Sequence, residues 1–562
     1  MMEKALFLAM AAVGAAAAPA TLFAAPFAPG EVTVGGEIGR RMDAAADALM
    51  RLDIERTYLR HFRVRREQPE VWGGFSGWSM ALDALVKAAA HGVGGEAMRA
   101  FKDRWLRETV GTQAADGSIS MYAGKPGMWD SHEQAYFLQA FSRNAIWFGD
   151  PASREAARRL GDFILANRVA VNLGLQSGLL WLYRATGDVR YADFCRDAYL
   201  IEGTNDDYDR ILPVNGVAHV YTWLERALAQ CEYAAFTGRR SPTLFDSTDE
   251  AFRRAFGDGL SVSGTISGGN HWGEIWDDSQ LGRGKWGETC ATAYLLRLTA
   301  LRMAEPDAGT RFGDLYERVL HNAFFAAQSA DGRRHRYFTP FDQPGAWWDK
   351  GDTYCCPNNF RRMVFEIPDA VFTRRADGVA VNLYAPAHLK ADGLEIRMET
   401  DYPQDGKVCL TVVAERAGRL FLRVPRWTGL ADAGRWRAER YPAGTSRLEA
   451  AFPMKPRLVA GRRFQAGKAA VLCGPVVYAL STKDVTWRGG VDCLRIDGDR
   501  PLRRTDGGIA VALKDVNRRQ GERTVTFVPF ADETRFQTYF GVVGAPVLAP
   551  QADELLPPLS AR

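Results

Sequence analysis

Four residues in two short motifs carry side chains that could hold one metal ion. The stretch "KWGETCATAYLL" contains Glu288 and Cys290, and "GDTYCCPNN" contains the adjacent pair Cys355 and Cys356. A disulfide between adjacent cysteines closes a strained ring, and a merely apolar pair would not need Gly, Asp, Pro and Asn around it. Three thiolates and one carboxylate form a sulfur-rich tetrahedral set that suits zinc. The two motifs therefore predict a zinc site.

The spacing within each motif constrains the backbone that must carry it. Residues i and i+2 of a regular helix point about 200° apart, so Glu288 and Cys290 can share an ion only where an extended segment enters a helix. We expect Cys355 and Cys356 to converge on an irregular turn, which the following Pro357 favours. Neither spacing matches a common zinc finger. The alternative is that Cys290 is an ordinary buried cysteine, Glu288 an acid at a helix start and the cysteine pair accidental.

Two kinds of element must position these motifs. From about residue 40 to 375, stretches such as "HEQAYFLQAFSRNAIWFG" have helical spacing, and helix pairs recur, as in "GLLWLYRATGDVRYADFCRDAYL". We expect a closed α/α barrel over residues 29–375. Later runs such as "KVCLTVVA" and "RLFLRVPRW" predict an antiparallel β-sandwich over residues 376–548, followed by a loose tail over 549–562. Hydrolases and lyases that act on sugars share this plan, so the fold cannot choose between them.

The composition narrows the class of partner. At 562 residues the chain needs two or more domains. Its 15 Trp residues suit a cleft that binds sugars, although most Trp side chains are core. The net charge of +4 is small and no Lys/Arg run is present, so we expect no nucleic-acid partner.

The first residues, "MMEKALFLAMAAVGAAAAPATLFAAPFAPG", have the pattern of a secretory signal peptide. One Lys precedes a short apolar stretch that ends in small residues and Pro19. We expect a signal peptide over residues 1–28, cleavage between Ala18 and Ala28, a periplasmic or secreted protein and no integral membrane segment. The eight cysteines are too sparse for a disulfide scaffold, and a bound metal would protect the vicinal pair from oxidation.

The motifs resemble glycoside hydrolase family 127, the β-L-arabinofuranosidase type, and its neighbours. The likeness covers roughly residues 70 to 530 and includes "ETCA", "TYCCPNNFRR", "NLYAPA", "METDYPQDGKV", "LRVPRW" and "CGPVVYAL". The resemblance implies an (α/α)6 barrel followed by β-sandwich structure. It also implies Zn²⁺ held by Glu288, Cys290, Cys355 and Cys356, with Cys355 as the nucleophile.

This resemblance implies a retaining mechanism. The thiolate is the nucleophilic form of cysteine, and zinc coordination removes the thiol proton. Cys355 would attack the anomeric carbon, and water would later release the sugar with net retention. The family uses a Glu upstream of the ETC motif as acid and base, which matches Glu274 in "SGGNHWGEIWDDSQ". Asp277 and Asp278 are alternatives, but adjacent acids are more typical of a solvated loop.

Several aromatic and histidine side chains could contact the substrate. His271 and Trp272 could raise the pKa of Glu274 or position the leaving group. His132 and His219 could hold sugar hydroxyls, or could be ordinary core histidines. Further candidates for stacking on sugar are Tyr354 and Trp348, whereas Arg361 and Arg362 are expected to form structural ion pairs.

Three functions remain open at this point. The first is an exported, zinc-dependent, retaining exo-glycosidase acting on oligo- or polysaccharide, with L-arabinofuranosides or a related sugar as substrate. The others are a polysaccharide lyase on the same fold and a non-catalytic carbohydrate-binding protein with a structural zinc. The turn reads "CCPNN" where many relatives have "CCPPN", and "IWDDSQLGRGKWG" lacks the "Y-x-L-P-N" pattern of the arabinofuranosidases. These departures bear on which sugar is the substrate more than on the expected reaction mechanism.

Overall fold

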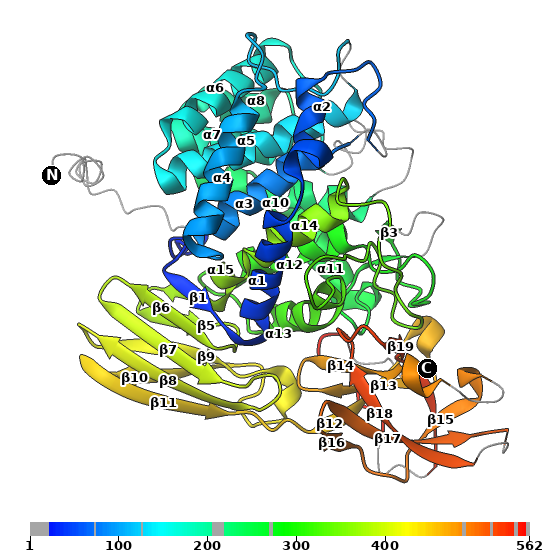
Figure 1. Cartoon of the computed structure of the whole chain (residues 1–562). Coiled ribbons are helices and arrows are strands. Elements are labelled where there is room, and N and C mark those ends of the chain that lie inside the picture. Colours follow the sequence, from blue (N-terminus) through cyan, green and yellow to red (C-terminus); the bar gives the residue numbers. More distant parts are fainter. Residues whose placement is uncertain are drawn as a thin grey trace.

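The computed structural model describes residues 22–71, 75–124, 127–204, 219–268, 274–485, 490–517, 521–544 and 549–557. Its helical part is built from two rings of helices (Figure 1). The inner ring consists of α3 (Trp78–Ala90), α5 (Met128–Phe148), α7 (Leu175–Thr186), α10 (Val220–Thr237), α12 (Thr289–Met303) and α14 (Cys355–Val364). The outer ring consists of α1 (Gly36–Met50), α4 (Gly95–Val110), α6 (Pro151–Ala166), α8 (Val189–Asp197), α11 (Asp246–Arg254) and α13 (Arg311–Val319).

The inner ring closes on itself. Each inner helix packs against the next, from α3 through α5, α7, α10 and α12 to α14, and α14 packs against α3. The chain alternates between the rings, with α4 on α3, α6 on α5 and α8 on α7. Inner helices are buried on nearly all sides, as in α3, where every residue from Trp78 to Ala89 is buried. The expected (α/α)6 barrel is therefore confirmed.

This alternation fixes the direction of the inner helices. Each outer helix returns the chain to the end of the barrel where the next inner helix starts, so the inner helices run parallel. Their amino-terminal ends therefore gather at one end of the barrel. Unsatisfied N–H groups give each of these ends a partial positive charge. That end is suited to hold anionic side chains.

Shorter helices and turns complete the helical part. These are α2 (Arg60–Arg63), α15 (Ile367–Val371), the π-turns Glu55–Leu59, Ala255–Gly259 and Leu320–Phe324, and the strands β2 (Ser267–Gly268) and β3 (Ile275–Trp276). Within the described residues, no helix combines the length and apolar character needed to cross a membrane.

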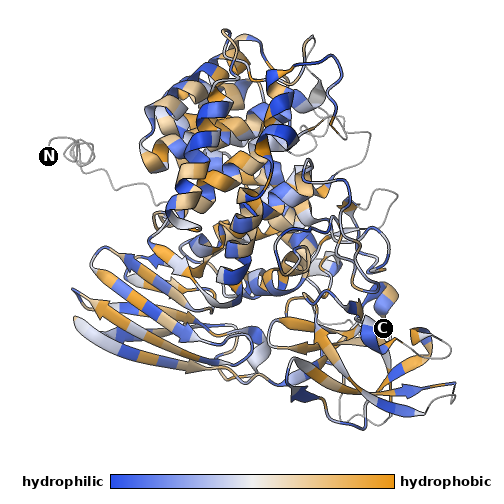
Figure 2. Cartoon of the chain, in the orientation of Figure 1, coloured by the Kyte–Doolittle hydropathy of each residue, from blue (hydrophilic) through white to orange (hydrophobic). Residues whose placement is uncertain are grey.

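The strand-rich part forms two units rather than the single sandwich that we expected. The first pairs a five-stranded sheet, β1-β6-β7-β8-β11, with a four-stranded sheet, β10-β9-β5-β4. Its strands are β1 (Val32–Val34), β4 (Phe372–Arg375), β5 (Gly378–Val381), β6 (Ala387–Ala391), β7 (Leu394–Thr400), β8 (Lys407–Ala414), β9 (Gly418–Arg423), β10 (Trp436–Tyr441) and β11 (Gly444–Ala451). Hydrophobic and hydrophilic residues alternate along these strands, as expected of a sheet with one face covered (Figure 2).

The second unit is a nine-stranded, mostly antiparallel sheet at the carboxyl-terminal end of the chain. Its strands are β12 (Pro456–Ala460), β13 (Lys468–Cys473), β14 (Val476–Ser481), β15 (Leu494–Asp497), β16 (Arg503–Thr505), β17 (Gly508–Asp515), β18 (Glu522–Pro529), β19 (Arg535–Gln537) and β20 (Phe540–Val543). Short 3₁₀ turns lie at Arg426–Thr428, Arg463–Gln465, Thr482–Asp484 and Val491–Cys493. Both units lie below the barrel in the view of Figure 1.

Two segments differ from the expected domain boundaries. Strand β1, before the barrel, pairs with β6 of the sandwich, with Val32 opposite Leu389. Residues 549–557, which we expected to be a loose tail, are held to the protein: Arg318 pairs with both Asp553 and Glu554, and Leu555 is fully buried. Strand β1 and residues 553–555 thus each connect two parts of the described structure.

Candidate active site

The Glu-Cys motif lies where an extended segment enters α12. Glu288 directly precedes the helix with φ −59° and ψ 131°, and its N–H donates to Ser267 Oγ at 2.9 Å. Cys290 follows in the first turn of α12. The expected local structure of this motif is confirmed. It allows the carboxylate and the thiol, two residues apart, to face one point.

The vicinal cysteines instead begin a regular helix, so the expectation of an irregular turn was wrong. Cys355 and Cys356 are the first two residues of α14, after Tyr354 in an extended conformation. Consecutive helical residues are only about 100° apart, and at a helix start neither is covered by a preceding turn. Both sulfurs can therefore face a site beyond the helix end.

Figure 1 shows α12 and α14 side by side, and their first turns bring the four expected ligands together. One ligand atom from each of Glu288, Cys290, Cys355 and Cys356 lies within 4.8 Å of all the others. Cys290 Sγ is 3.1 Å from Cys356 Sγ, which is 3.8 Å from Glu288 Oε1. Glu288 Oε2 is buried and has no hydrogen-bond partner among the described residues. This unsatisfied oxygen beside three soft sulfurs fits a zinc ion.

The charges of the cluster are also compatible with a bound cation. Burial raises the pKa of Glu288, Cys290 and Cys356 well above their usual values. Hydrogen bonds from the thiols of Cys290 and Cys356 hold the pKa of Cys355 well below its usual value. Without an ion, the cluster thus carries mainly one negative charge, on the sulfur of Cys355. A divalent cation would let all four groups ionise, and the ends of α12 and α14 add partial positive charge.

A second layer of side chains holds the cluster from inside the barrel. Asn359 Nδ2 donates to Cys290 Sγ at 3.2 Å, and Arg362 Nη1 donates to Asn359 Oδ1 at 3.1 Å. Arg362 is buried and pairs through Nε with Asp83 at 2.7 Å. These contacts fix the orientation of the Asn359 amide, so its donor faces the sulfur. Such outer contacts tune the affinity of a metal site.

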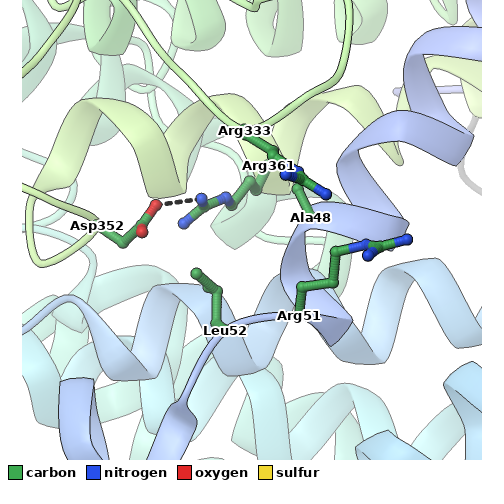
Figure 3. A pocket seen from close by; sticks show the side chains of 6 residues that line it. All are labelled: Ala48, Arg51, Leu52, Arg333, Asp352 and Arg361. Carbon is green, nitrogen blue, oxygen red and sulfur yellow. Dashed lines mark hydrogen bonds and ion pairs between the residues drawn. The ribbon is translucent and has the colours of Figure 1, made fainter.

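Arg361 forms its ion pair on the other side of α14. Figure 3 shows its guanidinium pointing toward Asp352, at a cavity of about 440 Å³ that Arg51 and Arg333 also line. Arg361 Nη1 further donates to Asn358 Oδ1 at 3.2 Å. Arg361 and Arg362 therefore form the structural ion pairs expected of them, and they hold the helix that begins with the vicinal cysteines.

Glu274 lies next to the cluster and has the properties of a general acid. Its Oε1 accepts a hydrogen bond from Tyr337 at 2.6 Å, and its Oε2 is 3.3 Å from His219 Nε2. Burial raises the pKa of Glu274 to about 7, and the nearby sulfur of Cys355 adds to this. The Tyr337 hydroxyl is also 3.9 Å from Cys355 Sγ, so it bridges the acid and the candidate nucleophile. The carboxyl group is thus protonated in part near neutral pH.

His219 lies between the two carboxyl groups. Its Nδ1 is 3.7 Å from Glu288 Oε2, and burial lowers the pKa of His219 to about 4, so the ring is neutral at neutral pH. His132 lies in the first turns of α5 against Phe75 and Tyr136, and burial lowers its pKa to about 3. His219 directly precedes α10 and His132 lies near the start of α5, so both share the end of the barrel that carries the cysteines.

Aromatic side chains surround the cluster on the loop before α14. Trp348 stacks on Tyr354 with ring centroids 5.0 Å apart, and Tyr337 packs on both rings. His271 and Trp272 lie outside the described residues. Neither Asp277 nor Asp278 replaces Glu274: the first accepts the N–H of Ser279 in a turn, and the second is exposed.

The sequence analysis missed Tyr337. Its hydroxyl donates to the acid, yet it lies in the segment "HRYFTP", which has no motif or periodicity to mark it. It reaches the site because the next residue, Phe338, bridges to Glu288, and because Thr289 N–H donates to the Tyr337 carbonyl at 2.9 Å. Only the fold brings this segment beside the ETC motif.

A closed (α/α)6 barrel with a largely buried acid next to a partly exposed cysteine, followed by β-sheet units, fits a glycoside hydrolase, and the family comparison agrees. Residues 121–369 match the β-L-arabinofuranosidase GH127 catalytic domain, and residues 378–439 match the GH127 middle domain. The chain belongs to glycoside hydrolase family 127. A carbohydrate substrate follows from this membership. Because the family consists of hydrolases, the membership also argues against the lyase and the non-catalytic binding protein.

Solved structures share the whole fold. One described as a GH127 β-arabinofuranosidase has a TM-score of 0.77 and 18% identity, covering 93% of this chain and 98% of that one. A GH127 β-L-arabinofuranosidase from Geobacillus stearothermophilus T6 has a TM-score of 0.76 and 19% identity, covering 91% of this chain and all of the other. No curated protein matches the chain significantly in sequence. At these identities the structures show the fold alone.

Proposed function

We propose that this protein is an exported, zinc-dependent, retaining exo-glycosidase that acts on β-L-arabinofuranosides. One observation carries the proposal: an acid with a pKa of about 7, Glu274, shares the hydroxyl of Tyr337 with Cys355, the one partly exposed member of a Cys3Glu cluster. The relatives named as β-L-arabinofuranosidases support the sugar, and the amino-terminal sequence pattern supports export.

The cluster residues would hold the ion and supply the nucleophile. When bound, zinc keeps its cysteine ligands deprotonated at neutral pH. Cys290, Cys356 and Glu288 are fully buried and would hold it, whereas Cys355 is accessible to a substrate. This difference in exposure supports Cys355 as the nucleophile. His219, beside Glu274, and Tyr354, which directly precedes Cys355, would contact the sugar.

The reaction proceeds in two displacements. In the first, Cys355 Sγ forms a bond to the anomeric carbon as the glycosidic C–O bond breaks, and Glu274 gives its proton to the leaving oxygen. In the second, the ionised Glu274 takes a proton from water, whose oxygen attacks the anomeric carbon as the C–S bond breaks. Each displacement inverts the anomeric carbon, so the product keeps the configuration of the substrate. Tyr337 stabilises the ionised Glu274 between the two steps.

The test combines product stereochemistry with metal content. Nitrophenyl α- and β-furanosides and pyranosides are screened, and the anomer released first is followed by NMR. We expect cleavage of the β-L-arabinofuranoside with retention, and one zinc per chain. Glu274→Gln should lower kcat by about 10² to 10⁴ and keep the zinc, because the acid and base are lost without loss of a ligand. Asp277→Asn, which alters only a turn, is the matched control.

Other results would refute specific parts of the proposed mechanism. Release of the inverted anomer would exclude a covalent thioglycoside intermediate. Full activity in Cys355→Ser would exclude Cys355 as the nucleophile. An unsaturated uronate as the product would identify a lyase instead. Export is tested separately, by the amino-terminal sequence of the protein recovered from the periplasm and medium.

A further inference from the structure

One exposed phenylalanine is held beside the loop that begins at Glu274. Phe464 is 67% exposed, the highest fraction among the large hydrophobic residues described. It lies in the 3₁₀ turn Arg463–Gln465 of the second β unit. With Arg463, Asp278 and Ser279 it lines an open hollow of about 370 Å³. The barrel and the second β unit therefore both contribute to this surface, and its residue Asp278 lies four positions after the candidate acid in the sequence.

The turn that carries Phe464 is fastened to this loop. Phe464 N–H donates to the carbonyl of Ser279 at 3.0 Å. Gln465 Nε2 donates to the carbonyls of Gln280 and Leu281 at 2.9 and 3.2 Å. Because backbone groups on the barrel side accept these bonds, the position of the Phe464 ring is fixed relative to the loop.

The backbone is held in an unfavourable conformation on both sides of this junction. Gln280 has a φ of 61° and Arg463 a φ of 52°, in the left-handed region that residues other than glycine avoid. Arg463 is held there by ion pairs with Asp258 at 2.6 Å and Asp278 at 3.5 Å. Gln280 is held by hydrogen bonds from its amide to the carbonyls of Asp258 and Leu260. Such strained backbone conformations persist only where the surrounding contacts hold them in place, and they are found most often at active sites and ligand sites.

The chemistry of the hollow suits a sugar ring. An exposed aromatic face can pack against the C–H face of a pyranose or furanose, and it is flanked by a carboxylate, a guanidinium and a hydroxyl that can bond to sugar hydroxyls. The two charges pair with each other, so the hollow has no net charge to select an ionic ligand. A neutral carbohydrate matches both features.

We propose that Phe464, Arg463, Asp278 and Ser279 form a distal subsite for the leaving-group part of the substrate; this rests on the proposed function. A general acid gives its proton to the leaving oxygen, so the leaving group lies on the Glu274 side of the cleaved bond. Asp278 lies four positions after Glu274, so their Cα atoms are at most about 14 Å apart. The hollow is therefore within reach of the leaving chain, and the sugar bound at Phe464 would be a unit of that chain.

The test compares two substrates with the same terminal sugar. The short one is a nitrophenyl arabinofuranoside, and the long one is an arabino-oligosaccharide with several further sugars beyond the cleaved bond. Phe464→Ala should lower the ratio of kcat/KM for the long over the short substrate by about tenfold, as expected for loss of one aromatic contact. Phe464→Trp should preserve the ratio. Val413→Ala removes a 43% exposed apolar side chain from β8 and is the control that should not change the ratio.

Each outcome decides the proposal. An unchanged ratio in Phe464→Ala, with the wild type active on both substrates, overturns the subsite and leaves the proposed function standing. A change in sedimentation of Phe464→Ala would show that a second copy of the chain covers this surface, which also overturns it. A wild type inactive on both substrates refutes the proposed function and the subsite together.

Discussion

Replacing Tyr337 by Phe tests whether a hydrogen bond sets the working pH of the candidate acid. The Tyr337 hydroxyl donates to Glu274 Oε1 at 2.6 Å, in a site where the tyrosine is buried. This bond favours the ionised carboxylate, so it lowers the pKa of Glu274, whereas burial raises it, to a net value of about 7. The variant removes this hydrogen bond, together with the longer contact of the hydroxyl to Cys355 Sγ at 3.9 Å, and keeps the ring in place.

The expected shift follows from the strength of such a bond. A hydrogen bond to a charged group contributes about 1.5 to 3 kcal/mol. One pKa unit corresponds to about 1.36 kcal/mol, so loss of the bond should raise the pKa of Glu274 by about one to two units. The protonated form is the general acid. The alkaline limb of the kcat/KM profile, where Glu274 loses its proton, should therefore move to higher pH by this amount, while the maximal rate falls.

The assay is the dependence of kcat/KM on pH, which reports groups of the free enzyme. Tyr58→Phe is a matched control because this buried tyrosine donates to the carbonyl of Asp352 at 3.1 Å, behind the cysteine helix. Its alkaline limb should coincide with that of the wild type. An alkaline limb that stays in place or moves to lower pH in Tyr337→Phe would refute the assignment of this limb to Glu274.

Three further predictions concern the metal and the domain junction. Chelation should abolish activity and lower Tm, because an ion at a thousandfold excess over its Kd adds roughly 4 kcal/mol of stability; an unchanged Tm would contradict a bound ion. Asn359→Leu, which removes the donor to a ligand sulfur, should weaken zinc binding by about 10- to 100-fold in a competition titration, whereas the exposed Asn167→Leu should not. Arg423→Leu leaves Asp314 and Glu317 buried without their partner and should cost about 3–5 kcal/mol in urea unfolding; a change below about 1 kcal/mol would show that the pairs do not hold barrel and sandwich together.

The fold was predictable where one local pattern dominates. Continuous apolar character with helical spacing marks α3 and α5, and alternation marks β8, so the order of barrel and sheets follows from the sequence. The division of the strands into two units did not follow, because the strands of both units are short β-branched and aromatic runs, and no such run shows which strands it pairs with. Strand β1 was missed because three residues carry too little periodicity to reveal a partner more than 350 positions away, at Leu389.

The sequence identified those site residues that belong to a recognisable motif. Glu288 and the three cysteines were found by type and spacing, and Glu274 by its place before the ETC motif. The start of helix α14 at Cys355 was not predicted, because Pro357 suggests a turn. Proline also fits the first turn of a helix, because the N–H group that it lacks would have no hydrogen-bond partner within the helix there. Tyr337 was beyond reach, since its role depends on a bridge between separate segments.

The barrel explains why these motifs can act at all. Parallel inner helices bring their positive amino-terminal ends to one end of the ring, and Cys290, Cys355 and Cys356 occupy the first turns of α12 and α14 there. A thiolate at this place is stabilised by two helix ends before any ion binds, and the same ends favour the carboxylate of Glu288. A helix start also leaves its side chains uncovered by a preceding turn, so Cys355 can reach a substrate while Cys356, one residue further in, stays buried. Under the proposed function, the vicinal pair would divide two tasks: the buried sulfur of Cys356 would hold the ion while the sulfur of Cys355 bonds to the sugar.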